Sequence, residues 1–262
     1  MKKFLIILLT FSSVLSMGAQ VSLKALQTKA EAGDAEAQTD LGVKCFYGKD
    51  VPQDYEAAVD WFRKAAGEEY PRAQYNLGYC YEYGLGVLRD FDEALTLYQK
   101  AAEQGYASAQ NSMGECYFYG KGTYQDYDVA ATWFRLAAQQ GDADAQNNLG
   151  DCYYYANGVE KNDSLSVVWF KKAAEQGHVG AQKNLGYRYD EGIGVEQNFA
   201  HAVYWYYKAA TAGNADAQYR LGVCYEQGKG VKKSRVKALQ WYRKSAALED
   251  LRAVEAVERM TK

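Results

Sequence analysis

Residues 73–108 read AQYNLGYCYEYGLGVLRDFDEALTLYQKAAEQGYAS, and the same pattern recurs along the chain at a fixed interval. The pair Ala-Gln that opens it returns every 36 residues, at positions 37–38, 73–74, 109–110, 145–146, 181–182 and 217–218. A fixed period of this length is typical of a repeat array, in which each unit packs on its neighbours. The repeat is therefore the structural unit of this chain.

Each repeat is predicted to contain two helices. Ala73, Leu77 and Tyr81 share one face of a helix with 3.6 residues per turn. This first helix is expected to end at Gly84, because glycine readily adopts the positive φ of a helix C-terminus. A second helix is expected to begin behind a side chain that accepts a backbone hydrogen bond, and every copy has one: Asp54, Asp90, Asp126, Asn162, Asn198 and Ser234.

Two columns of residues indicate how the helices pack. The second helix carries a column that we expect in the core, with an aromatic residue after each member from Phe62 to Tyr242: Trp61, Leu97, Trp133, Trp169, Trp205 and Trp241. The first helix carries an internal glycine in every copy: Gly42, Gly78, Gly114, Gly150, Gly186 and Gly222. Each such glycine costs roughly 1 kcal/mol relative to alanine, so we expect a neighbouring helix to approach closely there.

The shared pattern, AQxxLGxxYxxGxGVxxDxxxAxxWYxKAAxxG, resembles the Sel1-like repeat, a relative of the tetratricopeptide repeat. The resemblance implies an all-α fold, an α/α superhelical solenoid of six 36-residue helix-turn-helix repeats with capping half-repeats, and a role in assembling protein complexes. Asp50, Glu69 and Ala156 stand where the pattern has a turn glycine, which puts the geometry of those turns in question. The repeats are expected at residues 37–72, 73–108, 109–144, 145–180, 181–216 and 217–252.

The two ends of the chain are expected to differ from the repeats. Residues 1–19 have two lysines, an apolar run and small residues near Ala19, which is typical of a secretory signal peptide. We therefore expect an exported protein, periplasmic or secreted, with no membrane span in the mature form. Residues 20–36 are predicted to form an N-terminal capping helix and residues 253–262 a C-terminal one, on one continuous array with no second domain.

The charge balance argues against a nucleic-acid partner. The chain has 30 basic and 33 acidic residues, and removing Lys2 and Lys3 leaves 28 against 33, a net charge of −5. A protein that binds nucleic acid usually presents an excess of positive charge.

The residues that could react or bind a ligand all have a structural explanation. Cys80, Cys116, Cys152 and Cys224 occupy one column, about 9–10 Å apart if the helix pairs stack, whereas a disulfide needs Cα atoms within about 7 Å. All five cysteines of the mature chain are therefore expected to be free thiols that pack as small apolar groups. Turn strings such as GLGV follow helices, so they indicate helix ends and not phosphate-binding loops.

No cofactor and no metal site is expected. His178 and His201 lie in different columns and are expected at the surface. Ser234 and Lys237 match the Ser-x-x-Lys of penicillin-recognising enzymes, but Ser234 occupies the helix-cap column, which explains it without catalysis.

The surface most suited to a partner is the wall formed by the first helices. In tetratricopeptide-like packing, the residues two, five and six positions after each leucine-type residue face a concave groove. These positions are aromatic and acidic: Tyr79, Glu82, Tyr83, Glu115, Phe118, Tyr119, Asp151, Tyr154, Tyr155, Tyr187, Asp190, Glu191, Val223, Glu226 and Gln227. Rigid aromatics provide contact area at low entropic cost, and carboxylates favour lysine or arginine on the partner.

Three functions fit this sequence. The first is a non-catalytic scaffold that binds a peptide or protein with basic residues along the groove. The second is a glycan- or peptidoglycan-binding module, because aromatic side chains stack on sugar rings. The third, suggested by family association alone, is a weak β-lactam hydrolase or penicillin-binding protein; no repeat departs far enough from the pattern to hold a nucleophile, a base and oxyanion donors.

Overall fold

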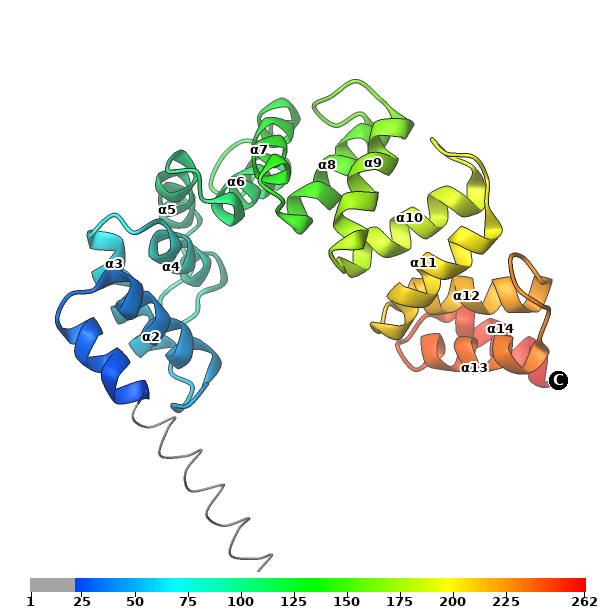
Figure 1. Cartoon of the computed structure of the whole chain (residues 1–262), viewed down its shortest axis with the longest axis horizontal. Coiled ribbons are helices and arrows are strands. Elements are labelled where there is room, and N and C mark those ends of the chain that lie inside the picture. The colour runs from blue at the N-terminus through cyan, green and yellow to red at the C-terminus, as the bar shows by residue number, and fades with distance from the viewer. Residues whose placement is uncertain (1–21) are drawn as a thin grey trace, which may run out of the picture. The chain divides into compact units, whose positions relative to one another are not determined.

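A computed structural model describes residues 22–262, and within that range the chain is helical, without a strand. The predicted all-α fold of helix-turn-helix repeats is confirmed (Figure 1). The predicted signal peptide lies outside the described residues. We predicted one continuous array, whereas the chain forms two compact units that divide between Gln125 and Asp126, inside the third predicted repeat.

The first unit contains the helices of the first two repeats and the first helix of the third. Residues 22–31 are helical, and Leu23, Leu26 and Ala30 pack on Leu41. The helices that follow are α2 (Ala35–Tyr47), α3 (Tyr55–Gly67), α4 (Pro71–Tyr83), α5 (Phe91–Glu103) and α6 (Ala107–Tyr119).

The second unit contains the remaining helices. They are α7 (Tyr127–Gln139), α8 (Ala143–Tyr155), α9 (Asp163–Glu175), α10 (Val179–Glu191), α11 (Phe199–Thr211), α12 (Ala215–Gln227), α13 (Arg235–Ala246) and α14 (Leu251–Thr261). Helix α14 packs through Ala253, Ala256 and Met260 against Tyr242 of α13. The predicted repeat boundaries and the capping role of the two terminal helices stay predictions.

The predicted start residues of the second helices are confirmed. Asp54 accepts from the backbone N–H of Ala57 at 2.9 Å, and Ser234 accepts from that of Lys237 at 3.3 Å. The other four cap their helices in the same way: Asp90, Asp126, Asn162 and Asn198. Each side chain satisfies a first-turn N–H group that has no partner inside the helix.

The internal glycines of the first helices allow a ring to pack against the backbone. A Cβ on Gly78 would lie 2.9 Å from the Tyr98 ring, and one on Gly186 would lie 2.6 Å from the Tyr206 ring. The expected close approach is confirmed at five of the six glycines, and the approaching group is the aromatic side chain of the second helix in the same repeat. Packing of that ring offsets the low helix propensity of glycine.

The core column lies one residue later than we predicted. The aromatic that follows each tryptophan-column residue is buried: Phe62, Tyr98, Phe134, Phe170, Tyr206 and Tyr242. Trp61, Trp133, Trp169 and Trp241 are only half-buried, while Leu97 and Trp205 are buried. Lys64 lies over the Trp61 ring at 4.0 Å, and Lys172 lies over the Trp169 ring at 4.1 Å. Trp61 and Trp169 therefore lie at the edge of the core, each covered by a lysine side chain.

All five cysteines are free thiols, as expected. Cys80, Cys116, Cys152 and Cys224 are buried and Cys45 is half-buried. Burial raises the pKa of the Cys80 thiol to about 12, because a thiolate is poorly solvated inside the protein. A thiol that stays protonated is a poor nucleophile, so the buried column packs as small apolar groups.

The turns that lack glycine keep the glycine conformation. Ala156 ends α8 with φ 60°, and Asp50 and Glu69 have φ of 67° and 57°. These three turns therefore have the same backbone geometry as the turns with glycine. A residue with a side chain is sterically disfavoured in this left-handed region.

Candidate binding site on the first helices

The last residue of each of four first helices is an exposed tyrosine. Tyr47, Tyr83, Tyr119 and Tyr155 end α2, α4, α6 and α8 with 72%, 51%, 63% and 65% of their surface exposed. Tyr83, Tyr119 and Tyr155 were predicted to face the groove, and Tyr47 was not. At the equivalent position of α10, Glu191 is exposed as well.

Two of the predicted groove carboxylates are engaged within the protein. Glu82 is only 8% exposed, and it accepts from the Tyr98 hydroxyl at 2.8 Å and from Lys121 Nζ at 2.6 Å. Asp190 accepts from the Tyr206 hydroxyl at 3.3 Å. The expectation that Glu82 faces open space was wrong, because the buried tyrosine beneath it needs an acceptor for its hydroxyl.

Three more of the predicted acids have hydrogen-bond partners within the protein. Glu115 accepts from Asn111 Nδ2 at 3.1 Å. Asp151 accepts from Asn147 Nδ2 at 3.3 Å, and burial raises its pKa although Lys183 and Arg188 act in the opposite direction. On α12, the first helix of the last repeat, Glu226 accepts from the Tyr242 hydroxyl at 2.7 Å and from Arg259 at 2.6 Å. Of the other two predicted groove residues on this helix, Val223 is half-buried and Gln227 is exposed.

Arginines of the second unit cover two of the predicted groove tyrosines. The Arg188 guanidinium lies 3.5 Å from the centre of the Tyr154 ring, and that of Arg220 lies 4.7 Å from the Tyr187 ring. A cation over the face of an aromatic ring is attracted by the ring quadrupole. These two ring faces are therefore already occupied by groups of the chain itself.

The first unit instead contains a cluster of aromatic side chains between α2 and α4. The Phe46 ring contacts those of Tyr47, Tyr55 and Tyr79, with centroids 5.0, 5.0 and 6.1 Å apart, and Tyr79 contacts Tyr83 at 4.5 Å. Such edge-to-face and tilted pairs are favourable arrangements of aromatic rings.

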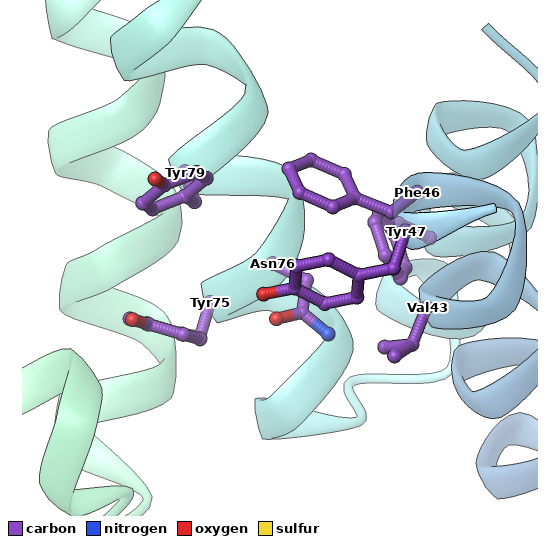
Figure 2. Close-up of a pocket in the computed structure, with 7 residues that line it drawn as sticks. Val43, Phe46, Tyr47, Tyr75, Asn76 and Tyr79 are labelled. Atoms are coloured by element: carbon purple, nitrogen blue, oxygen red, sulfur yellow. The ribbon is translucent and has the colours of Figure 1, made fainter. Parts of the chain in front are cut away.

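This cluster borders a pocket of about 140 Å³ (Figure 2). Side chains of α2 and α4 face each other across it, and Phe62 of α3 also lines it. The lining residues are Val43, Phe46, Tyr47, Phe62, Tyr75, Asn76 and Tyr79. A concave, mostly apolar site with few polar groups is the usual form of a ligand site.

One polar group of the pocket has no partner. Asn76 Nδ2 is buried and donates no hydrogen bond to any described residue. Residues at equivalent positions are paired: Asn184 donates to Asn147 at 3.2 Å, and Asp40 accepts from Arg72 at 2.7 Å. Leaving a buried donor unpaired costs free energy, and Nδ2 has no accessible surface, so a ligand in the pocket would reach this donor by displacing a covering side chain.

Tyr79 is the one predicted site residue that lines this pocket. Phe46 and Tyr47 were missed, although the offsets that selected Tyr79, Glu82 and Tyr83 from Leu77 select Val43, Phe46 and Tyr47 from Leu41. The signal for these two pocket residues was therefore present in the sequence of the first repeat.

The other chemical candidates have structural roles. His201 is exposed, as predicted, but His178 is half-buried, because its Nδ1 accepts from the Ala181 N–H at 2.9 Å at the start of α10 and its Nε2 lies 3.0 Å from Asp144. Ser234 caps α13, as noted above. Among residues 22–262 we find no cluster of metal-binding side chains, and no helix there is long and apolar enough to cross a membrane.

Repeated helix pairs with an aromatic, ligand-sized pocket on the first helices define an α-solenoid of the tetratricopeptide-like class. The chain belongs to the Sel1 repeat family, whose model matches residues 35–68, 71–106, 107–142, 143–178, 179–214 and 215–250. Each match begins two residues before the Ala-Gln pair that set the predicted repeat boundaries. Proteins of this family are typically non-catalytic scaffolds for protein–protein interaction.

Two solved structures share both sequence and fold with this chain. A protective antigen of uropathogenic Escherichia coli is 40% identical, with a TM-score of 0.78 over 90% of this chain and 50% of the antigen chain. A Sel1 repeat protein of Oxalobacter formigenes is 35% identical, with a TM-score of 0.79 over 90% of this chain and 69% of the other.

A curated relative shares a shorter segment. The secretory immunoglobulin A-binding protein EsiB of Escherichia coli O6:H1 is 47% identical over 45 residues, which are 17% of this chain and 9% of EsiB. The chain thus spans half of the antigen chain and a small part of EsiB.

Proposed function

We propose that this chain is a non-catalytic, exported scaffold that holds an apolar side chain of a protein partner in the pocket between α2 and α4. The observation that carries the proposal is the combination of aromatic walls with the unpartnered Asn76 amide. The predicted groove residues of the other first helices would extend the contact surface within each unit.

The size of the pocket limits what it accepts. Its volume of about 140 Å³ is close to that of a protein cavity of ~150 Å³ that binds benzene. One aromatic or branched aliphatic side chain therefore fills it. Tyr47, with 72% of its surface exposed, stands beside the pocket and would cover the inserted side chain.

The Asn76 amide adds a polar requirement. A partner that inserts a side chain also brings the carbonyl groups of its own backbone to the pocket. A carbonyl within hydrogen-bond reach of Asn76 Nδ2 would satisfy the donor that is unpaired in the free protein. This contact would favour an extended segment, whose backbone carbonyls are not used in a helix.

Fewer carboxylates than the sequence predicted are available to attract basic residues of the partner. Glu82 and Asp190 accept hydrogen bonds from buried tyrosines, so their charge is partly used inside the protein. Glu191 is exposed and Asp151 is half-buried, and these two would attract a lysine or arginine within the second unit.

One relative suggests a defined probe for the partner. EsiB is named for binding secretory immunoglobulin A, and the short segment that it shares with this chain makes that immunoglobulin a reasonable first ligand to test. Export fits this choice and follows from the signal-peptide pattern of residues 1–19.

The test is a selection from a library of random peptides displayed on phage, with the full chain as the target and secretory immunoglobulin A measured in parallel. Selected peptides are expected to share one aromatic or leucine residue. Their affinity should fall at least tenfold, about 1.4 kcal/mol, for Tyr47→Ser and for Asn76→Leu.

Tyr204→Ser and Tyr207→Ser are the matched controls. Both tyrosines are 51% exposed, and they lie on α11, a second helix away from the predicted surface. Equal losses in the controls and in Tyr47→Ser would contradict the pocket assignment. Failure to select any peptide, with retention of the chain on peptidoglycan, would favour the glycan-binding alternative.

A further inference from the structure

Arg188 in the second unit is a buried cation without a hydrogen-bond partner. The residue is 3% exposed, and its Nε and Nη1 atoms are buried and donate to no described group. No ion pair joins it to a carboxylate among residues 22–262. Buried charges are normally paired, because removing an unpaired ion from water is costly.

The repeat pattern shows what the other copies hold at this place. The residue equivalent to Tyr154 is a carboxylate in three repeats, Glu82, Asp190 and Glu226, and an aromatic in two, Phe46 and Phe118. Beside Glu82 and Asp190, the residue equivalent to Arg188 is a cysteine. Burial and then the charge of Glu82 raise the pKa of Cys116, and burial and then Asp190 raise that of Cys224, so these groups are neighbours.

At the equivalent place between α8 and α10 both residues differ in charge from these pairs. Arg188 takes the cysteine position, and the uncharged Tyr154 takes the carboxylate position, 3.5 Å from the guanidinium. The chain thus carries an unpaired cation at a position where four other repeats have a cysteine and the first has Lys44, which pairs with Asp50.

We propose that Arg188 binds a carboxylate of a ligand, which enters beside Tyr154 and takes the place that an acid side chain occupies in three other repeats. The ring of Tyr154 covers one face of the guanidinium, and the N–H groups donate in the plane of the group, so stacking and hydrogen bonding do not compete. Because Nε and Nη1 have no accessible surface, the entering group displaces a covering side chain.

The surroundings favour a carboxylate over a phosphate. Asp151 and Asp190 lie on the same two helices, and the charge of Arg188 acts on Asp151. These acids reduce the local positive potential, so a group with one negative charge is tolerated better than one with two. The site is separate from the pocket of the first unit, so the proposal for Arg188 does not depend on the proposed function.

The experiment is a titration of the ¹⁵N-arginine-labelled full chain, observed by NMR at the Nε–Hε signals. Arg188→Met identifies the Arg188 signal by its loss, and Arg188→Lys serves if the methionine variant does not fold. Sodium acetate and sodium phosphate are added separately, with sodium chloride keeping the ionic strength constant. The exposed Arg63 is the internal control.

The proposal predicts a saturable shift of the Arg188 signal with acetate that exceeds the shift of Arg63 at least threefold. A shift that phosphate alone produces would overturn the assignment to a carboxylate. Equal, small shifts of Arg188 and Arg63 with both anions would overturn the site altogether.

Tyr154→Glu provides an independent check, because it supplies the carboxylate that three of the equivalent positions carry. In this variant the Arg188 signal is expected near its acetate-bound position, and acetate should no longer move it. A Tyr154→Glu protein that still responds to acetate as the unaltered chain does would contradict the proposal. Tyr155→Glu, one residue away and exposed, is the matched control that should respond like the unaltered chain.

Discussion

The aromatic faces of the first helices differ between the two units. Between α2 and α4, Phe46, Tyr47 and Tyr79 border an open pocket, and among residues 22–262 no cation lies over these three rings. Between α8 and α10, Arg188 covers Tyr154, and between α10 and α12, Arg220 covers Tyr187. The same repeat positions thus form a candidate binding surface or an internal packing contact, depending on whether the next repeat supplies an arginine.

A second difference concerns the ring that packs on the internal glycine. Where this ring is a tyrosine, its hydroxyl donates to a carboxylate on the first helix, as in Tyr98 to Glu82 and Tyr242 to Glu226. Where it is Phe62 or Phe170, the first-helix position holds an aromatic, Phe46 or Tyr154. An acid in this column is therefore part of the fold and does not by itself mark a binding surface.

Converting the second repeat to the pattern of the fourth should have the largest effect on stability. Tyr98→Phe leaves the buried Glu82 without one donor, which should lower the free energy of unfolding by about 1–3 kcal/mol. The double variant Glu82→Tyr with Tyr98→Phe copies Tyr154 and Phe170, so it should recover part of the loss, with a coupling of at least about 0.5 kcal/mol.

Urea unfolding of the single and double variants measures this coupling, and hydrogen exchange in α4 and α5 locates it in the first unit. If the two single losses simply add, then the carboxylate and the hydroxyl do not act as a pair.

The two exposed tyrosines at equivalent helix ends should differ in binding. Tyr47→Ser removes the ring beside the pocket, whereas Tyr155→Ser removes a similarly exposed ring in the other unit. We expect at least a tenfold loss of affinity, about 1.4 kcal/mol, for Tyr47→Ser. Tyr155→Ser should change the affinity less than threefold. Isothermal calorimetry with a selected peptide measures both, and a reversed order would move the site to the second unit.

Exchanging the residues that end equivalent first helices should have opposite effects in the two units. Ala156 has φ 60° after α8, and Gly84 has φ 67° after α4. Ala156→Gly should therefore raise the free energy of unfolding, and Gly84→Ala should lower it, each by about 1 kcal/mol. Thermal unfolding of the two variants checks the signs. Two changes of the same sign would mean that the turn geometry differs between the units.

Acid should weaken the second unit through Glu226, by less than about 1 kcal/mol because the ion pair is partly exposed. The hydrogen bond from Arg259 is the largest influence on the pKa of Glu226 and holds it below its usual value. Burial has the next largest influence and acts in the opposite direction. Its contribution is therefore fully present above the ordinary glutamate pKa of about 4.3. It disappears as the pH falls through the lower folded-state pKa.

Urea unfolding at pH 7 and at pH 3 measures this contribution, with Glu226→Gln as the variant that lacks it. The variant should be less stable than the unaltered chain at pH 7, and the difference should be smaller at pH 3. A difference of the same size at both pH values would mean that the charge of Glu226 does not stabilise the fold.

Much of the fold followed from residues that act locally. The cap residues from Asp54 to Ser234 and the helix-ending glycines were predicted one by one, because a cap depends only on its own turn. Close approach at the internal glycines was also predicted, although the approaching ring was not identified. The burial of the tryptophans was overestimated, because periodicity selects a helix face and not the depth of each residue on it.

The candidate site was predicted in part. Tyr79 was identified, and Phe46 and Tyr47 were within reach of the same rule. The buried state of Glu82 needed knowledge of the Tyr98 hydroxyl, although the joint variation of those two columns among the repeats indicates the pair. The unpaired donors of Asn76 and Arg188 depend on every neighbour in space, so no pattern along the chain reveals them.

The most direct test of the central claim is hydrogen exchange of the full chain with and without a selected peptide or secretory immunoglobulin A. Binding in the pocket predicts slower exchange in α2 and α4 of the first unit, with α8 and α10 changed much less. Protection confined to α8 and α10, or to the second helices α9 and α11, would contradict the assignment of the binding site to the first unit.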